Sequence, residues 1–321
     1  MKYHNTPTFK RKTARHFVVR ENTTMMDFLL FDAMSDQSRT TVKQILRDRF
    51  ISVGGHAVTQ HDYKLNVGDV VCLNATPMPE GLNHPKIKIL WQDEYLIMIS
   101  KDAGVPTVAS GNEKDRTALR IVSDHLKKFD HRAKVFMLNR LDKDSAGLVL
   151  MAKTQEIQND FISHWENYVV KQEFLVAVEG SKLEKDGILA PPEHEDDNNI
   201  THTRRHPRIN RHNDPFGMEA GRASYKVIKY GDVCSLLFVK LEAGRNNQLR
   251  KQFKSLNIPI AGDWRNGSTF KQLGRVALQG VTFSFIHPID RQERTFRMPE
   301  NPILGKLARM KSEKEYNFFK K

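Results

Sequence analysis

Cysteine is scarce in this chain, and the two cysteines present, Cys72 and Cys234, are far apart. Neither belongs to a CxxC pair or has histidines at metal-binding spacing nearby. A disulfide framework is therefore excluded as an organising principle, and a zinc site has no support. This cysteine usage fits a reducing compartment, so we expect a cytoplasmic protein.

Long apolar runs and early acidic residues are also missing. No run approaches the length of a membrane span, and the basic start of the chain lacks the apolar centre of a secretory signal. No acidic residue precedes Glu21, so residues 1–15 are interpreted as a flexible basic arm. We expect no association with a membrane.

Positive charge is what the chain has in excess. Lysine and arginine number 51 against 38 acidic residues, a formal net charge of +13. Such an excess favours a polyanionic partner, above all a nucleic acid, through neutralisation of phosphates. A hydrophobic content of 39% and an aromatic content of 9% indicate a packed globular protein rather than a solvated tail.

The pattern of apolar residues changes along the chain in a way that predicts two modules. Residues 25–34 and the segment after Ser38, which can cap a helix, have helical spacing, whereas 51–58 and 64–73 read as strands with glycine turns. We therefore expect a small module of two helices and a hairpin at residues 16–75. A connector rich in Pro, Gly and Asn follows at 76–86.

Residues 87–321 alternate many short strands with few helices, which predicts an α+β domain on a mainly antiparallel sheet. Strands are expected within 87–104, 135–141, 147–153, 172–180, 223–231 and 234–244, and helices within 117–129, 157–167 and 246–256. The least globular stretch, 191–217, contains His194, His202, His206 and His212. Metal binding by these histidines, and with it a hydrolytic enzyme, is an alternative, but their spacing matches no closed site and favours a solvated loop.

Two segments carry residues suited to chemistry. In 138–153, Asp142 lies at a strand end beside the small residues of Ser145–Gly147, where a substrate could approach closely. An ordinary charged turn is the alternative. In 241–267, Arg250 falls in the first turn of a predicted helix, where the helix dipole favours acids. That arginine needs a carboxylate or phosphate partner, unless the helix merely presents a solvated basic face.

Taken together and in order, four motifs resemble those of the large-subunit type of RNA pseudouridine synthases. LNRLDKDSAGLVLMAKT resembles an HRLD sequence followed by SGLLLxAK, and KQEFLVAVEG is similar to KxYxAxVxG. LEAGRNNQLRKQF resembles xTGRTHQIRxH, and IPIAGDWRNG resembles xPIxGDxxYG. Residues 25–73 resemble the S4 RNA-binding module that is often attached to these enzymes.

The resemblance implies a reaction that needs no cofactor and no metal. The glycosidic bond of a uridine in RNA is broken, the uracil is turned, and it is rejoined to the ribose through carbon five. The resemblance implies that Asp142 acts at the ribose as nucleophile or base, and that Arg250 lies beside it as the balancing cation. Asp142 and Arg250 should therefore meet in the folded protein.

Other site residues follow from the same motifs. Arg140 would occupy the space left by the flipped base, Leu249 would pack against that base, and Phe174 would offer an aromatic face in place of the usual tyrosine. Phe174 has no hydroxyl, so removal of the carbon-five proton is not assigned to it. The remaining residues expected to contact RNA are Arg245, Asn139 and, in the S4-like module, Arg39, Lys43 and Arg47.

The chain also departs from the family pattern. Asn139 replaces histidine, Phe174 replaces tyrosine, Asn246 and Asn247 replace threonine and histidine, and Asp102 replaces the proline of a KPAG motif. These changes support an alternative: a catalytically weak or inactive RNA-binding or ribosome-assembly factor. The expected partner is ribosomal RNA of the large subunit, with transfer RNA as the alternative, and the chain is expected to act as a monomer.

Overall fold

The computed structural model describes residues 14–78, 81–109, 116–180, 183–189, 223–241, 248–312 and 315. Within these ranges the chain is a mixture of helices and strands, and every strand ladder is antiparallel. The predicted α+β class with mainly antiparallel sheets is confirmed. Among these residues, no helix is both long and apolar enough to cross a membrane.

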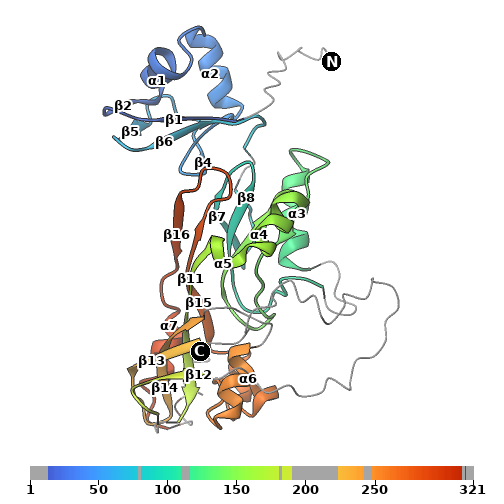
Figure 1. The fold of residues 1–321 in the computed structure, drawn as a ribbon, viewed down its shortest axis with the longest axis vertical. Coiled ribbons are helices and arrows are strands. Elements are labelled where there is room, and N and C mark those ends of the chain that lie inside the picture. The colour runs from blue at the N-terminus through green and yellow to red at the C-terminus, as the bar shows by residue number, and fades with distance from the viewer. Residues whose placement is uncertain are drawn as a thin grey trace.

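The N-terminal residues form a small module of helices over short strands, drawn in blue in Figure 1. Its four-stranded sheet has the order β1 (Arg15–Val18), β6 (Val70–Leu73), β3 (Ile51–Val53), β4 (His56–Ala57), and β2 (Thr23–Thr24) pairs with β5 (Lys64–Leu65). The helices are α1 (Met25–Phe28), the π-helix η1 (Leu29–Ala33) and α2 (Arg39–Arg47). As expected, the Ser38 hydroxyl caps α2 by accepting a bond from Thr41 N.

The buried faces of these elements make one apolar core. It includes Met25, Leu29, Val42, Leu46 and Ile51, each at most 1% exposed. Strand β1 begins at Arg15, the last residue of the stretch interpreted above as a flexible arm.

A second sheet follows the connector. Its strand order is β7 (Ile87–Gln92), β8 (Leu96–Lys101), β10 (Gly147–Ala152), β9 (Phe136–Met137). The helices α3 (Ala118–Lys127), α4 (Gln155–Ser163) and α5 (Trp165–Tyr168) belong to the same part of the chain. Strand β10 is buried along its whole length, as its continuous apolar run GLVLMA requires.

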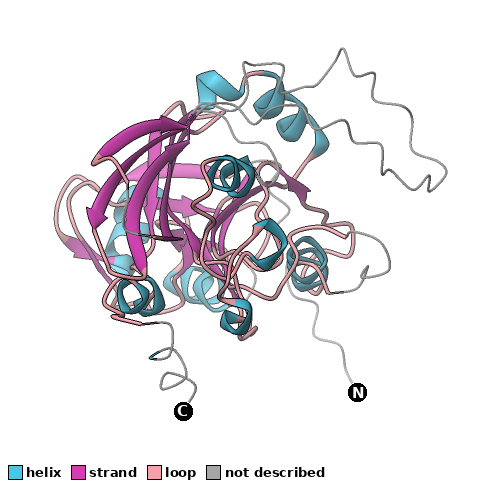
Figure 2. Cartoon of the chain, turned by 90° about the horizontal axis from the view of Figure 1, so that it is seen from below, coloured by secondary structure: helices cyan, strands magenta, loops and turns pink. Residues whose placement is uncertain are grey.

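The third sheet has six strands in the order β12 (Asp186–Leu189), β13 (Ala223–Lys229), β14 (Cys234–Leu241), β11 (Val169–Glu179), β15 (Leu278–Ile286), β16 (Glu293–Arg297). Seen from below, its long strands curve together as one layer (Figure 2). The remaining helices are α6 (Gln248–Ser255), α7 (Pro302–Leu307) and the 3-10 turns η2 (Trp264–Asn266) and η3 (Lys271–Leu273). Helix α6 and strands β12–β14 lie at the end of the molecule opposite the N-terminal module (Figure 1).

Two glycines join the second and third sheets. Gly147 has a φ of +145°, and a Cβ atom there would lie 2.6 Å from the backbone N of Gly280. Gly280 N donates to Ala146 O at 2.9 Å, and Ala146 N donates to Leu278 O at 3.2 Å. Because neither glycine carries a side chain, the start of β10 lies directly against the backbone of β15.

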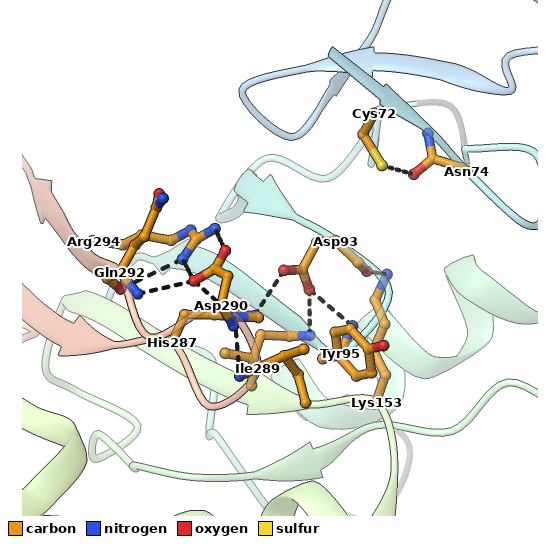
Figure 3. A network of polar contacts seen from close by, with 11 residues as sticks. Cys72, Asn74, Asp93, Tyr95, Lys153, His287, Ile289, Asp290, Gln292 and Arg294 are labelled. Carbon is orange, nitrogen blue, oxygen red and sulfur yellow. Dashed lines mark hydrogen bonds and ion pairs between the residues drawn. The ribbon is translucent and has the colours of Figure 1, made fainter. Parts of the chain in front are cut away.

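A polar network lies where the N-terminal module meets the second sheet (Figure 3). Asp93 Oδ1 accepts bonds from the backbone N atoms of Tyr95 and Leu96, both at 2.8 Å. Asp93 Oδ2 lies 2.9 Å from His287 Nε2, and Lys153 Nζ donates to Gln92 Oε1 at 3.0 Å and to Asp93 O. Burial lowers the pKa of Lys153 to about 8.

The module itself packs on this region through Gly55 and Trp91. A Cβ atom on Gly55 would lie 2.2 Å from Trp91 Cδ1, so the backbone of the β3–β4 turn rests on the indole. Trp91 also packs against Phe296, with ring centroids 5.8 Å apart, and the Arg294 guanidinium lies 5.2 Å from the centroid of its ring. The turn with Gly54 and Gly55 therefore seats the small module on the larger domain.

Candidate active site

Asp142 lies between β9 and β10, on a segment that hydrogen bonds from Thr107 and Ser145 hold in place. Thr107 Oγ1 donates to Leu141 O at 2.5 Å and accepts from Leu141 N at 3.1 Å. The turn closes through Ser145 N, which donates to Asp142 O at 3.2 Å. The Asp142 side chain is 18% exposed, so the alternative of an ordinary solvated turn is wrong.

Lys101 fixes the same turn from inside. This lysine is fully buried at the end of β8, and its Nζ donates to Ser145 O at 2.7 Å, Val105 O at 2.8 Å and Asp142 O at 3.0 Å, with Asp102 O at 3.2 Å. Burial lowers the pKa of Lys101 to about 8, although the charges of Asp142 and Asp144 oppose the shift. An ammonium group thus gathers the carbonyls around Asp142.

Arg250 reaches Asp142 from α6, as the sequence predicted. Its Nη1 lies 3.1 Å from Asp142 Oδ2, and Arg250 is only 8% exposed. The expected meeting of these two residues, 108 positions apart, is confirmed. The requirement for a carboxylate partner in the first turn of α6 is also met.

A second carboxylate, Asp263, holds Arg250 more tightly than Asp142 does. Asp263 Oδ2 and Oδ1 accept from Arg250 Nε and Nη2, both at 2.6 Å, in a bidentate pair. Asn266 Nδ2 donates to Asp263 Oδ2 at 2.7 Å. The hydrogen bonds from Asp263 raise the pKa of Arg250 against the opposing effect of burial, and Asp142 adds to the rise.

Asp263 and Lys101 were not singled out from the sequence. Asp263 belongs to the segment IPIAGDWRNG, where it reads as one polar residue after a buried run. Lys101 ends the apolar strand LIMISK, and a lysine at a strand end is usually solvated. The available sequence signal was a charged residue directly bordering an apolar run, Asp263 in IPIAGDWRNG and Lys101 in LIMISK.

Phe174 and Leu249 lie in the core beside the site. Phe174 is 9% exposed and Leu249 5% exposed, and both belong to the main apolar cluster. Phe174 pairs with Gly280 across β11 and β15, and Gly280 is the residue in contact with Gly147. The Phe174 ring is thus close to the strand crossing from which the Asp142 segment emerges.

The two residues before Leu141 differ in their surroundings. Arg140 is exposed to solvent. Asn139 Nδ2 donates to Leu148 O at 3.2 Å, and Asn139 Oδ1 accepts from Leu150 N at 2.7 Å. Both polar ends of the Asn139 amide are used to brace β10, which argues against the predicted RNA contact. Arg245, Asn246 and Asn247 lie outside the described residues.

The basic residues predicted on the N-terminal module share one exposed helix face. Arg39, Lys43 and Arg47 all project from α2 and are exposed. A hollow of about 550 Å³ borders this face. Its lining is Lys43, Leu46, Arg47, Arg49, Thr59 and His61.

Metal binding gains no support from the part of the chain that the structure describes. There, no group of three or more His, Cys, Asp or Glu side chains could hold an ion. The histidines considered above, His194, His202, His206 and His212, lie outside the described residues.

The family is settled by comparison with known proteins. Residues 95–255, half of the chain, match the model of the RNA pseudouridylate synthase family. The matched range includes the Asp142 turn and all of α6. The chain therefore belongs to this family of enzymes, which isomerise uridine in RNA to pseudouridine.

Relatives agree with this assignment along most of the chain. An uncharacterized RNA pseudouridine synthase of Bacillus subtilis is 28% identical over 272 residues, covering 81% of this chain and 89% of the relative. The ribosomal large subunit pseudouridine synthase D of Nitrosomonas europaea is 28% identical over 289 residues, covering 85% of this chain and 80% of the relative. The corresponding enzyme of Escherichia coli is 24% identical over 291 residues, covering 85% and 86%.

Among solved structures, human RNA pseudouridylate synthase domain containing 1 superposes with a TM-score of 0.50 at 15% sequence identity. The match covers 75% of this chain and 96% of the human one. At this identity the likeness concerns the fold alone.

Proposed function

We propose that Asp142 is the carboxylate that acts on the ribose of the target uridine, as nucleophile or as base at the anomeric carbon. The arrangement of its two oxygens carries this proposal. Oδ2 faces Arg250 Nη1 at 3.1 Å, while the described residues place no donor on Oδ1. A carboxylate with one oxygen fixed and the other open is suited to attack on carbon.

Arg250 has two parts in this proposal. Its charge keeps Asp142 ionised in a largely buried place, since a carboxylate without a nearby cation would favour its neutral form there. Its geometry orients Asp142, because the bidentate pair with Asp263 leaves Nη1 as the guanidinium nitrogen directed at Asp142. The reaction needs no cofactor in this proposal.

A further step concerns the base of the target uridine, which must be flipped out of the RNA stack. A uridine must leave its stack before its glycosidic bond can be reached. We assign this step to Arg140, which is exposed two residues before Asp142. Phe174 and Leu249 line the core directly behind and would contact the flipped uracil after a small movement of side chains.

The N-terminal residues 16–75 are proposed to be an S4-like RNA-binding domain, joined by residues 76–86 to a catalytic domain at 87–321. The exposed cations of α2 and the adjoining hollow support this division. Lys43 and Arg47 are exposed cations that line one concave surface, which suits contacts with successive phosphates. The substrate proposed is ribosomal RNA of the large subunit, the RNA in the printed names of two relatives.

Pseudouridine mapping of total RNA tests both the activity and its target. Cells lacking the protein would be compared with cells complemented by the wild type or by Asp142→Asn. We expect one or a few sites of large-subunit ribosomal RNA to lose pseudouridine, and only the wild type to restore them. Lost sites in transfer RNA would replace the target, and restoration by Asp142→Asn would refute the role of Asp142.

A further inference from the structure

Trp264 is an exposed tryptophan that directly follows Asp263, the residue paired with Arg250 in the active site. The chain has three tryptophans, of which Trp91 and Trp165 are 8% and 6% exposed, whereas Trp264 is 56% exposed. The Arg265 guanidinium lies 5.1 Å from the centroid of the Trp264 ring. A large apolar ring kept in water next to a cation is an unusual use of tryptophan, because burial of its surface would stabilise the fold.

The turn that carries Trp264 is fixed to the catalytic network. Trp264 directly follows Asp263, and consecutive Cα atoms are only about 3.8 Å apart. Asn266 N and Ser268 N both donate to Asp263 O, at 2.9 and 3.1 Å. Gly262 N donates to Ser268 Oγ at 2.8 Å. The indole therefore projects from a rigid turn whose first residue also holds Arg250.

The surrounding charge identifies the kind of partner that fits. Residues 248–275 contain six basic residues and one acidic residue, Asp263, which is buried and paired with Arg250. The Glu179 carboxylate also contacts this segment and accepts hydrogen bonds from Ser268 and Thr269, so the cations remain in excess. Arg265, Lys254 and Lys271 are exposed. An apolar protein partner would not require this excess of cations, whereas a single strand of RNA offers phosphates for the cations and a π-face for the indole.

We propose that Trp264, backed by Arg265, stacks on a base of the RNA strand close to the target uridine. This inference rests on the proposed function, since it concerns the same substrate at the same site. Flipping the uridine removes one base from the stack, and the neighbouring nucleotides then lack a partner. Trp264 would supply that partner and so hold the strand while the uridine enters the site.

Kinetics test the proposal without knowledge of the target position. RNA labelled with tritium at uracil carbon five, from cells lacking the protein, keeps every target unmodified and releases the label on turnover. Trp264→Ala should raise KM roughly 5- to 150-fold, the effect of one lost base–aromatic stack, with kcat changed much less. Trp264→Phe should recover most of the loss. Phe129→Ala, which removes another exposed aromatic just after α3, should leave both constants unchanged.

Fluorescence supplies a readout independent of turnover. Because Trp264 is the tryptophan in contact with water, stacking of a base should quench emission when a twelve-nucleotide oligouridylate is added. Inorganic polyphosphate, which has charge but no bases, should quench much less. The difference should disappear in Trp264→Phe.

The outcomes separate this inference from the proposed function. A KM for Trp264→Ala within twofold of the wild type would overturn the stacking role, while loss of tritium release in Asp142→Asn would leave the proposed function standing. If the wild type released no tritium, the proposed function would fail, and fluorescence alone would decide the stacking. In that case equal quenching by oligouridylate and polyphosphate would reject it.

Discussion

Two polar networks lie at opposite ends of the same pair of strands. Strands β8 and β10 run antiparallel, with Lys101 beside Gly147 at one end and Leu96 beside Ala152 at the other. The active-site network of Lys101, Asp142, Arg250 and Asp263 surrounds the first end. The junction network of Asp93, Lys153, His287, Asp290 and Arg294 surrounds the second.

The two networks share their chemistry to a large extent. Each has a lysine whose pKa burial lowers to about 8. Lys101 donates to backbone carbonyls, and Lys153 donates to the Gln92 side-chain oxygen and to Asp93 O. Each also has an arginine bound to a carboxylate by two nitrogens, Arg250 to Asp263 and Arg294 to Asp290. The types of residue therefore do not distinguish a site of catalysis from a site of assembly.

The two networks differ in how many hydrogen bonds the central carboxylate, Asp93 or Asp142, accepts. Asp93 and Asp142 have nearly equal exposed fractions, 15% and 18%, so exposure decides nothing. Asp93 has protein groups on both oxygens, and these hydrogen bonds lower its pKa despite burial. Among the residues that the structure describes, only one Asp142 oxygen has a side-chain donor, Arg250 Nη1. A carboxylate that the fold satisfies completely serves structure, and one left half-satisfied is available to a substrate.

The largest contrast should come from Asp142→Asn. We expect tritium release to fall by at least about a thousandfold, as for loss of a group that reacts covalently or moves a proton. The free energy of unfolding should change by less than about 1 kcal/mol, because Arg250 keeps its bidentate partner Asp263. Single-turnover assays and urea denaturation measure the two effects. A large loss of stability would show that Asp142 is a structural carboxylate like Asp93.

Asp263→Asn should affect both properties. Removing one partner of a buried ion pair costs about 3–5 kcal/mol, and we expect the lower end because Asp142 still faces Arg250. Activity should fall roughly 10- to 100-fold, since a misplaced catalytic group can cost this much. Urea denaturation and tritium release report the two losses.

The matched control is Asn266→Ala, which removes one donor from Asp263 and leaves Arg250 paired. It should cost about 1 kcal/mol, the usual value of one hydrogen bond. If Asp263→Asn destabilised the protein no more than this control, Asp263 would not be what holds Arg250 in place.

The sequence predicted more of the contacts at the active-site end of β8 and β10 than at the junction end. The apolar periods of β8, β10 and β11 and the capping serine of α2 are local signals, and these elements were predicted. The Asp142–Arg250 pair was predicted from the resemblance of two motifs to those of the family. The helix dipole alone indicated only that Arg250 needs a carboxylate or phosphate partner.

What the sequence could not supply depends on distant contacts. Asp263 and Lys101 gain their roles from residues 13 and 41 positions away, and neither breaks a local rule. Strand β16 is short and polar, and helix α7 has only six residues, so tertiary packing rather than their own sequence pattern holds them in place. The hydrogen bonds from Asn139 to Leu148 and Leu150 of β10 likewise depend on the alignment of two chain segments, which no local pattern gives.

Asp93→Asn should give the reverse of the Asp142 result. The substitution removes the charge from a carboxylate that accepts two backbone bonds and faces His287, so we expect a loss of about 2–3 kcal/mol of stability. Tritium release at 25 °C should stay within about threefold of the wild type, because the network lies at the far end of β8. A loss of activity as large as that of Asp142→Asn would mean that the junction takes part in the reaction.

The smallest expected effect concerns pH and separates the two lysines. Below about pH 8 the Lys101 ammonium donates to the carbonyls around Asp142, and above pH 8 the neutral amine has one donor fewer. The lost bond, about 0.5–1.5 kcal/mol, should lower kcat/KM about two- to tenfold between pH 7.5 and 9. Stability should move the other way in this window. Both lysines have a folded pKa of about 8 against 10.5, so the unfolded chain binds more protons and folding is favoured as pH rises.

A fall in activity without a fall in stability would thus point to Lys101 rather than to unfolding. Profiles of kcat/KM from pH 6.5 to 9.5, with urea denaturation at each pH, measure both. Lys101→Met should lower activity and remove the descending limb, whereas Lys153→Met should keep the limb and alter only stability. If the limb persisted in Lys101→Met, another group would be titrating. If it disappeared in Lys153→Met, the two ends of β8 would be coupled, and the separation of catalysis from assembly along this strand would be wrong.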